Sequence, residues 1–139
     1  MKRFGLAGLL LCVVVLWSQV LAHSTINNFV TVFLDTNGGG LTGDFSGRVI
    51  TNPAATGTQT FNLPPAVTGM HFIFALSAAQ EIVANPDDND QILGFSGVGT
   101  GDAIKSSPST VGTTVELVAI DDTKWLPIRQ VGTWIDANP

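Results

Sequence analysis

Apolar and polar side chains alternate along several short stretches of the chain, and the clearest is residues 70–76. Met70, Phe72, Phe74 and Leu76 fall on one side of this stretch if it is extended, because successive side chains of a strand point to opposite faces. The pattern predicts a core strand. Each bulky side chain that it buries would contribute roughly 1.5–3 kcal/mol to stability.

A second pattern, in residues 113–134, predicts two strands folded back on each other. Val115, Leu117 and Ala119 alternate with their neighbours on the first strand, and residues 124–126 begin the second. The polar break 121–123 between them is typical of a tight turn, since Asp side chains can hydrogen-bond the turn backbone.

The whole chain contains fifteen glycines and seven prolines, and the part after residue 22 shows no long run at helical spacing. We therefore expect an all-β fold, an antiparallel β-sandwich or small barrel of about eight to ten short strands. Ile104 is expected to point inward from a Gly- and Ser-rich stretch. Further strands are expected at residues 26–34, 45–51, 58–63, 81–84, 90–93 and 131–134.

Residues 1–22 have the pattern of a signal peptide. Lys2 and Arg3 precede a nearly unbroken apolar run that leads to the small residue Ala22. That run is about 14 residues, shorter than the ~20 needed to cross a bilayer. We expect cleavage after Ala22, with an uncleaved anchor as the alternative. The exported chain would then comprise an N-terminal strand or arm region, residues 23–57, and a β-sandwich domain, residues 58–139.

Export changes both the cysteine count and the charge. Cys12 is the only cysteine and would leave with the signal, so the secreted domain would have no disulfide and no thiolate metal site. Two of the six basic residues, Lys2 and Arg3, would leave as well, while all eleven acidic residues stay. An acidic chain without a basic patch argues against nucleic acid as a partner, and no membrane partner is expected after cleavage.

Several short motifs follow one another along the chain, at residues 60–64, 69, 72–74, 78–80, 85–87, 92, 111–112, 115–118, 125 and 132–134. Their order resembles a family of small all-β domains that occur at the C-terminal ends of bacteriophage fibre-like virion proteins and in related phage and bacterial proteins. The resemblance implies a structural or surface-binding module, often oligomeric and without catalytic residues. Because this chain has the pattern of an export signal, an exported relative within an extracellular assembly is expected.

The first predicted strand is apolar on both faces, which requires cover on both sides or a second subunit. Such a strand could complete a neighbour's sheet, since strand addition supplies backbone hydrogen bonds along a whole edge. We therefore expect self-association into a homo-oligomer. The candidate contact residues are Phe29, Val30, Val32, Phe33 and Leu34.

Two tryptophans near the end of the chain have two possible roles. Trp125 and Trp134 could form a stacking platform for a cell-surface glycan, or they could pack in the core or between subunits, where Trp is enriched. Packing is the favoured interpretation, and sugar binding is retained as the alternative.

Metal binding is the remaining chemical possibility. Asp87, Asp88 and Asp90 concentrate the oxygen ligands that calcium prefers, although an ordinary turn explains them better. His23 would become the mature N-terminus and could bind copper together with His71, which is a weaker hypothesis. No cofactor is required, and no nucleophile motif is present. The expected function is therefore a non-catalytic, exported, self-associating or surface-attaching protein, with a carbohydrate-binding module and a copper-binding histidine-brace protein as alternatives.

Overall fold

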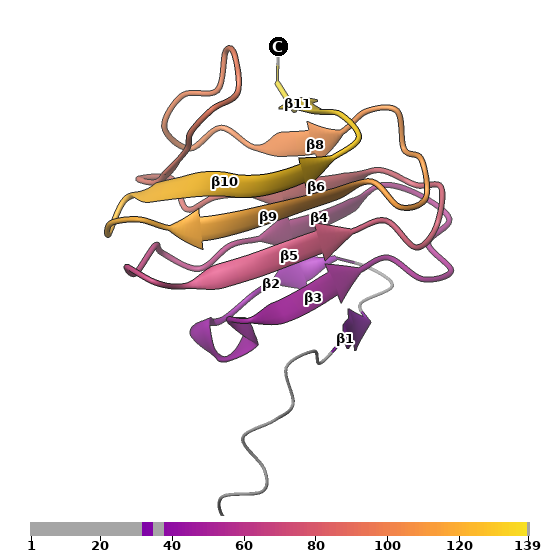
Figure 1. Ribbon diagram of the computed structural model, residues 1–139, viewed down its shortest axis with the longest axis horizontal. Coiled ribbons are helices and arrows are strands. Elements are labelled where there is room, and N and C mark those ends of the chain that lie inside the picture. The colour runs from indigo at the N-terminus through magenta and orange to yellow at the C-terminus, as the bar shows by residue number, and fades with distance from the viewer. Residues whose placement is uncertain (1–31, 35–37, 139) are drawn as a thin grey trace, which may run out of the picture.

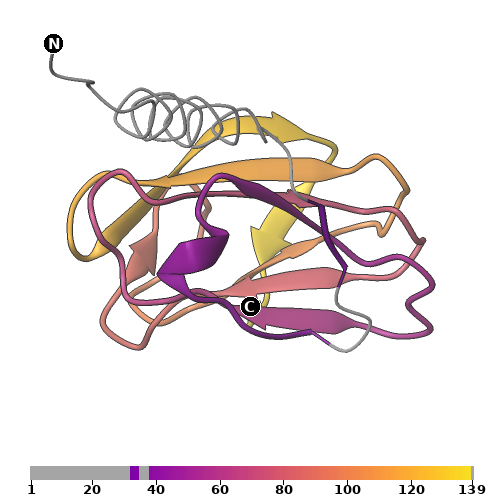
Figure 2. The same ribbon diagram turned by 90° about the horizontal axis from the view of Figure 1, so that it is seen from below.

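The computed structural model describes residues 32–34, for which only the backbone is considered, and residues 38–138. Two β-sheets pack face to face (Figure 1), and the view from below shows them as two layers (Figure 2). Among the described residues the only helical element is a 3-10 turn, η1 (Gly43–Phe45). The strands are β1 (Val32–Leu34), β2 (Gly39–Gly40), β3 (Arg48–Thr51), β4 (Gln59–Asn62), β5 (His71–Ala75), β6 (Ile82–Asn85), β7 (Gln91–Ile92), β8 (Ile104–Ser106), β9 (Thr114–Ala119), β10 (Lys124–Val131) and β11 (Trp134–Asp136).

The expectation of an all-β sandwich is confirmed, but both sheets are mixed and not antiparallel throughout as expected. The six-stranded sheet has the order β1-β3-β5-β9-β10-β7, and the five-stranded sheet has the order β11-β8-β6-β4-β2. Five neighbouring pairs are parallel: β1 with β3, β3 with β5, β2 with β4, β4 with β6, and β7 with β10. From β2 to β6 the chain alternates between the sheets. Each crossing reverses its direction, so the next strand in the same sheet runs parallel to the last.

The region before residue 58 was expected to be a strand or arm region, and its described part contributes strands to both sheets. From Gly38 on it contributes β2 to one sheet and β3 to the other, each beside a strand of the later region. The turn after β3 is held by Asn52, which is fully buried. The Asn52 Oδ1 accepts hydrogen bonds from the amides of Ser77 (2.9 Å) and Ala78 (3.1 Å), and its Nδ2 donates to the Gln80 carbonyl (2.9 Å).

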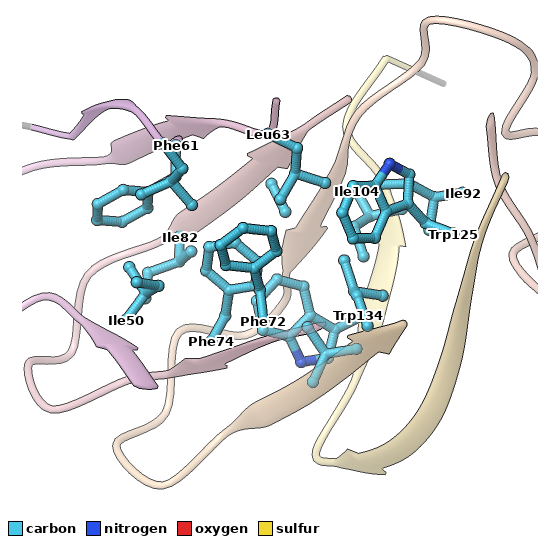
Figure 3. Close-up of a cluster of buried hydrophobic side chains, with 14 of the residues drawn as sticks. Ile50, Phe61, Leu63, Phe72, Phe74, Ile82, Ile92, Ile104, Trp125 and Trp134 are labelled. Atoms are coloured by element: carbon cyan, nitrogen blue, oxygen red, sulfur yellow. The ribbon is translucent and has the colours of Figure 1, made fainter. Parts of the chain in front are cut away.

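The core lies between the sheets and follows the alternation seen in the sequence. Phe72 and Phe74 on β5 are fully buried, while their neighbours along the strand are only partly buried. The Phe72 ring lies 5.7 Å from that of Trp125, and the Phe74 ring lies 5.9 Å from that of Phe61, centroid to centroid (Figure 3). Ile104 points inward as predicted.

The predicted hairpin is also confirmed. β9 and β10 pair antiparallel, and the turn between them is closed by Asp121, whose Oδ1 accepts a hydrogen bond from the Thr123 amide at 2.8 Å. This hydrogen bond holds the pKa of Asp121 below its ordinary value.

Candidate interaction surfaces

The outer faces of the two sheets differ in polarity. Cross-strand register and alternating burial identify the side chains that point away from the core. On the six-stranded sheet most of them are apolar, whereas the five-stranded sheet presents mainly amide, hydroxyl and ammonium groups. The first set, which we call the β5–β10 face, is Val49, His71, Ile73, Ala75, Thr114, Glu116, Val118, Leu126, Arg129 and Val131. The second set is Thr60, Asn62, Val83, Asn85, Lys105 and Ile135.

A small charged cluster occupies the middle of the β5–β10 face. The His71 Nε2 lies 2.7 Å from the Glu116 Oε1, and the Arg129 Nε lies 3.8 Å from the Glu116 Oε2. The carboxylate side chain is only 17% exposed, while the Arg129 side chain is 78% exposed. Glu116 is therefore held between two basic groups, and the guanidinium keeps most of its donors in solvent. The sequence alone could not show this cluster, because its members come from three strands whose register was unknown.

β10 forms part of an open edge beside this face. β7 pairs with it only at Lys124 and Trp125, so in the described part of the chain the rest of β10 has a neighbouring strand on one side only, which is β9. In the antiparallel ladder with β9 the nitrogen of Pro127 points away from β9, where its missing N–H costs no ladder hydrogen bond. A register irregularity follows between Pro127 and Arg129. Proline and a bulge both discourage further pairing at an edge, so the side chains of β10 are better placed for contact than its backbone.

Two shallow hollows open near the end of the chain. One, of about 330 Å³, lies between the 108–113 loop and the β10–β11 turn, and Val111 and Val131 contribute apolar atoms to it. The other, of about 310 Å³, lies between the loop after β7, the end of β10 and β11. Its lining includes the side chains of Gln130, Trp134 and Asp136, so it combines an amide, an aromatic ring and a carboxylate.

Both tryptophans lie in the core (Figure 3), as the favoured interpretation expected. Trp125 is fully buried and Trp134 is 3% exposed. The indole of Trp134 donates a hydrogen bond to the Thr114 carbonyl at 3.0 Å. Neither ring can serve as an open stacking platform for a sugar, which corrects the alternative assignment. A flat platform needs an exposed ring face, and here both faces pack against core side chains.

The three aspartates proposed for calcium do not converge. Asp90 is 2% exposed, and its Oδ2 accepts hydrogen bonds from the Ala66 amide (2.7 Å) and the Trp125 Nε1 (3.3 Å). Asp87 closes a turn by accepting from the Asn89 amide at 3.2 Å. Among residues 38–138, where the side chains are described, no group of three His, Cys, Asp or Glu residues could hold a metal ion. The calcium hypothesis is corrected accordingly: the carboxylates of Asp87 and Asp90 bind protein N–H groups.

The remaining predicted site residues lie partly outside the described chain. Phe29, Val30 and His23 fall outside it, so the copper hypothesis has only His71 in view, and His71 contacts Glu116. Val32, Phe33 and Leu34 form β1, which pairs in parallel with β3 of its own chain. β1 is nevertheless an edge strand, so one side of its backbone has no neighbouring strand among the described residues.

Comparison with models of known protein families gave no match, and comparison with curated protein sequences gave none either. None of the described residues belongs to a helix that could span a bilayer.

Proposed function

We propose that this chain is an exported, non-catalytic structural protein that associates with further copies of itself through the β5–β10 face. The observation that carries the proposal is the contrast between the two outer faces. Apolar atoms gain roughly 25 cal/mol per Å² when they leave water, so the apolar sheet face has more to gain from being covered than the polar one.

Apolar residues on this face lie in cross-strand pairs beside the charged cluster. Val49 is paired with Ile73, and Val118 is paired with Leu126 on one side and with His71 on the other. Leu126 is 36% exposed and Val131, near the hollow beside the 108–113 loop, is 56% exposed. Exposed apolar residues that gather on one face mark an interaction surface more often than isolated ones do.

A second copy is the occupant that charge favours. In a two-fold contact the same patch meets itself, so it must be neutral or carry both signs. The β5–β10 face carries one carboxylate, Glu116, beside the guanidinium of Arg129 and the imidazole of His71. The other described carboxylates lie in turns, in loops or on the five-stranded sheet. For an acidic chain, this is the face on which two copies repel each other least, and Arg129 retains free donors for a partner's Glu116.

Further support comes from the role of three polar side chains that contact the backbone. Asp90 and Asp121 hydrogen-bond backbone amides and Asn52 holds two loops together, so these polar groups act as structural ties. The resemblance to C-terminal domains of phage fibre-like proteins also favours a module that works by association. Export would place such an assembly outside the cell or on its surface.

The test compares two valine substitutions on opposite faces. Val118 and Val83 are both half-buried strand residues, at the centre of the β5–β10 face and of the opposite face. We expect the exported protein to be oligomeric by light scattering, Val118→Lys to be monomeric, and Val83→Lys to remain oligomeric. Similar melting temperatures for the two variants would show that both fold. A wild-type protein that is monomeric at millimolar concentration, or equal behaviour of the two variants, would refute the proposal.

A further inference from the structure

The hollow between the loop after β7, the end of β10 and β11 has features that self-association does not explain. It lies at one end of the sandwich, between the last residues of β10 in the six-stranded sheet and β11, the last strand of the five-stranded sheet. Its volume is about 310 Å³. The residues that line it are Gly94, Phe95, Ser96, Gln130, Trp134, Ile135 and Asp136.

Asp136 brings a carboxylate oxygen without a donor to this place. The side chain is largely buried, with 9% exposed. Its Oδ1 accepts a hydrogen bond from the Asn138 amide at 2.8 Å, whereas no described residue donates to its Oδ2. A β-carbon at Gly97 would lie 2.9 Å from this Oδ2, and Gly97 has φ +90°, so only glycine leaves the space beside the oxygen open. This oxygen is not among the buried side-chain atoms that lack a partner in the described part of the chain, so it reaches the surface of the hollow, where a ligand hydroxyl could donate to it.

The open edge of β11 supplies groups of the opposite kind. β11 is the last strand of its sheet, and its partner is β8. The Ala137 amide donates to the Ala103 carbonyl on the β8 side at 2.9 Å. Because backbone groups of an antiparallel strand alternate in direction, the N–H and C=O groups of Trp134 and Asp136 point to the open side. The same end of the sandwich therefore offers backbone donors as well as a carboxylate acceptor.

Gln130 adds an exposed amide. Its Nε2 donates to the Gly132 carbonyl at 3.1 Å, which leaves the Oε1 without a partner among the described residues. Ser96 provides a hydroxyl that can donate and accept, and Phe95 and Ile135 provide apolar atoms. Ligand pockets commonly combine a mainly apolar wall with a few polar groups that fix orientation.

We propose that this hollow binds one neutral sugar ring, as the free sugar or as the end of a glycan. Neighbouring hydroxyl groups of a sugar donate and accept at once, which matches the acceptors of Asp136 and Gln130 together with the backbone donors of β11. Its C–H face suits Phe95 and Ile135. The volume is at the lower end of the range of about 300–1,000 Å³ for ligand pockets, which suits a single ring. An ammonium ligand could donate to Asp136 and Gln130, but it has no acceptor for the backbone N–H groups of β11.

This site differs from the sugar platform that the sequence suggested. A platform would require exposed indole faces, whereas here Trp134 lines the hollow only with the small part of its surface that is exposed. Recognition depends on Asp136 and Gln130, which no sequence motif singled out. It is also separate from the β5–β10 face, so the two proposals can fail independently.

The test uses methyl glycosides of glucose, galactose, mannose and N-acetylglucosamine, titrated into the isotopically labelled exported protein. We expect at least one glycoside to cause saturable shifts of the Ser96, Gln130 and Asp136 amides. Removal of one ligand hydrogen bond in Gln130→Ala should weaken binding about tenfold, and Asp136→Asn should weaken it at least as much. Thr110→Ala, at the other hollow, is the matched control and should bind as wild type does.

The outcomes separate the possibilities. Gln130 is exposed, so its variant should fold even if Asp136→Asn does not. If no glycoside shifts these amides, or if Gln130→Ala binds with unchanged affinity, the proposal is overturned. If methylammonium shifts these amide signals and no glycoside does, the proposal is also overturned. Val118→Lys should bind the sugar as wild type does, because that change is on the other surface.

Discussion

The carboxylate of Asp90 is the polar group on which the core most depends, and its removal gives the sharpest stability prediction. Asp90 is nearly fully buried, and one of its oxygens serves two donors, the Ala66 amide at 2.7 Å and the Trp125 indole at 3.3 Å. These contacts join the loop after β4 to Trp125, which lies near the start of β10. Asp90→Ala would leave both donors buried without an acceptor.

The size of the effect follows from these two contacts. A buried donor left unsatisfied costs about 1–3 kcal/mol. The variant no longer has to bury a carboxylate charge, and this gain offsets part of the cost of the two donors. The free energy of unfolding should therefore fall by about 3 kcal/mol. In a domain of this size that corresponds to a fall in melting temperature of about 10 °C. Asp90→Asn keeps one acceptor oxygen and should lose about half as much.

Urea unfolding followed by tryptophan fluorescence would measure the change, and the NMR signal of the Trp125 indole would report on its hydrogen bond. Asp88→Ala is the matched control, because Asp88 is exposed in the same turn and should change stability by no more than about 0.5 kcal/mol. A loss below about 1 kcal/mol for Asp90→Ala, or an unshifted Trp125 indole signal, would show that the carboxylate does not have this role. Calcium or a chelator should leave the melting temperature unchanged.

Two further predictions concern turns. Gly132→Ala should destabilise the protein more than Gly112→Ala. Both glycines have positive φ, but of the two new β-carbons only the one at position 132 would meet a neighbour, the Thr113 Oγ1 at 2.7 Å. Equal free energies of unfolding for the two variants would contradict this. The Thr123 amide lowers the pKa of Asp121 in the folded protein. The stability that the ionised carboxylate adds is therefore fully present above the unfolded-state pKa of about 3.8. It is lost as the pH falls through the lower pKa of the folded state. Asp121→Asn should therefore be less stable than wild type at pH 7 and equal to it near pH 2, as thermal unfolding at both values would show.

Local alternation was enough to determine which side chains of the central strands face inward. The inward positions of Phe72, Phe74 and Leu117 follow from their spacing, because a strand reverses its side-chain direction at every residue whatever its partner is. The same holds for the β9–β10 hairpin, whose partners are adjacent in sequence and whose turn is closed by its own Asp121.

Strand order and the candidate surfaces depended on contacts that the sequence does not display. The parallel pairs arise because the chain crosses between sheets, and alternation within a strand is the same for parallel and antiparallel neighbours. Likewise, Asp90 looks like any turn aspartate until the fold places Trp125 beside it. His71, Glu116 and Arg129 meet only through the register of three strands. A residue's own strand determines its direction, but the partner strands determine what it meets, and in this sandwich many of those partners are distant in sequence.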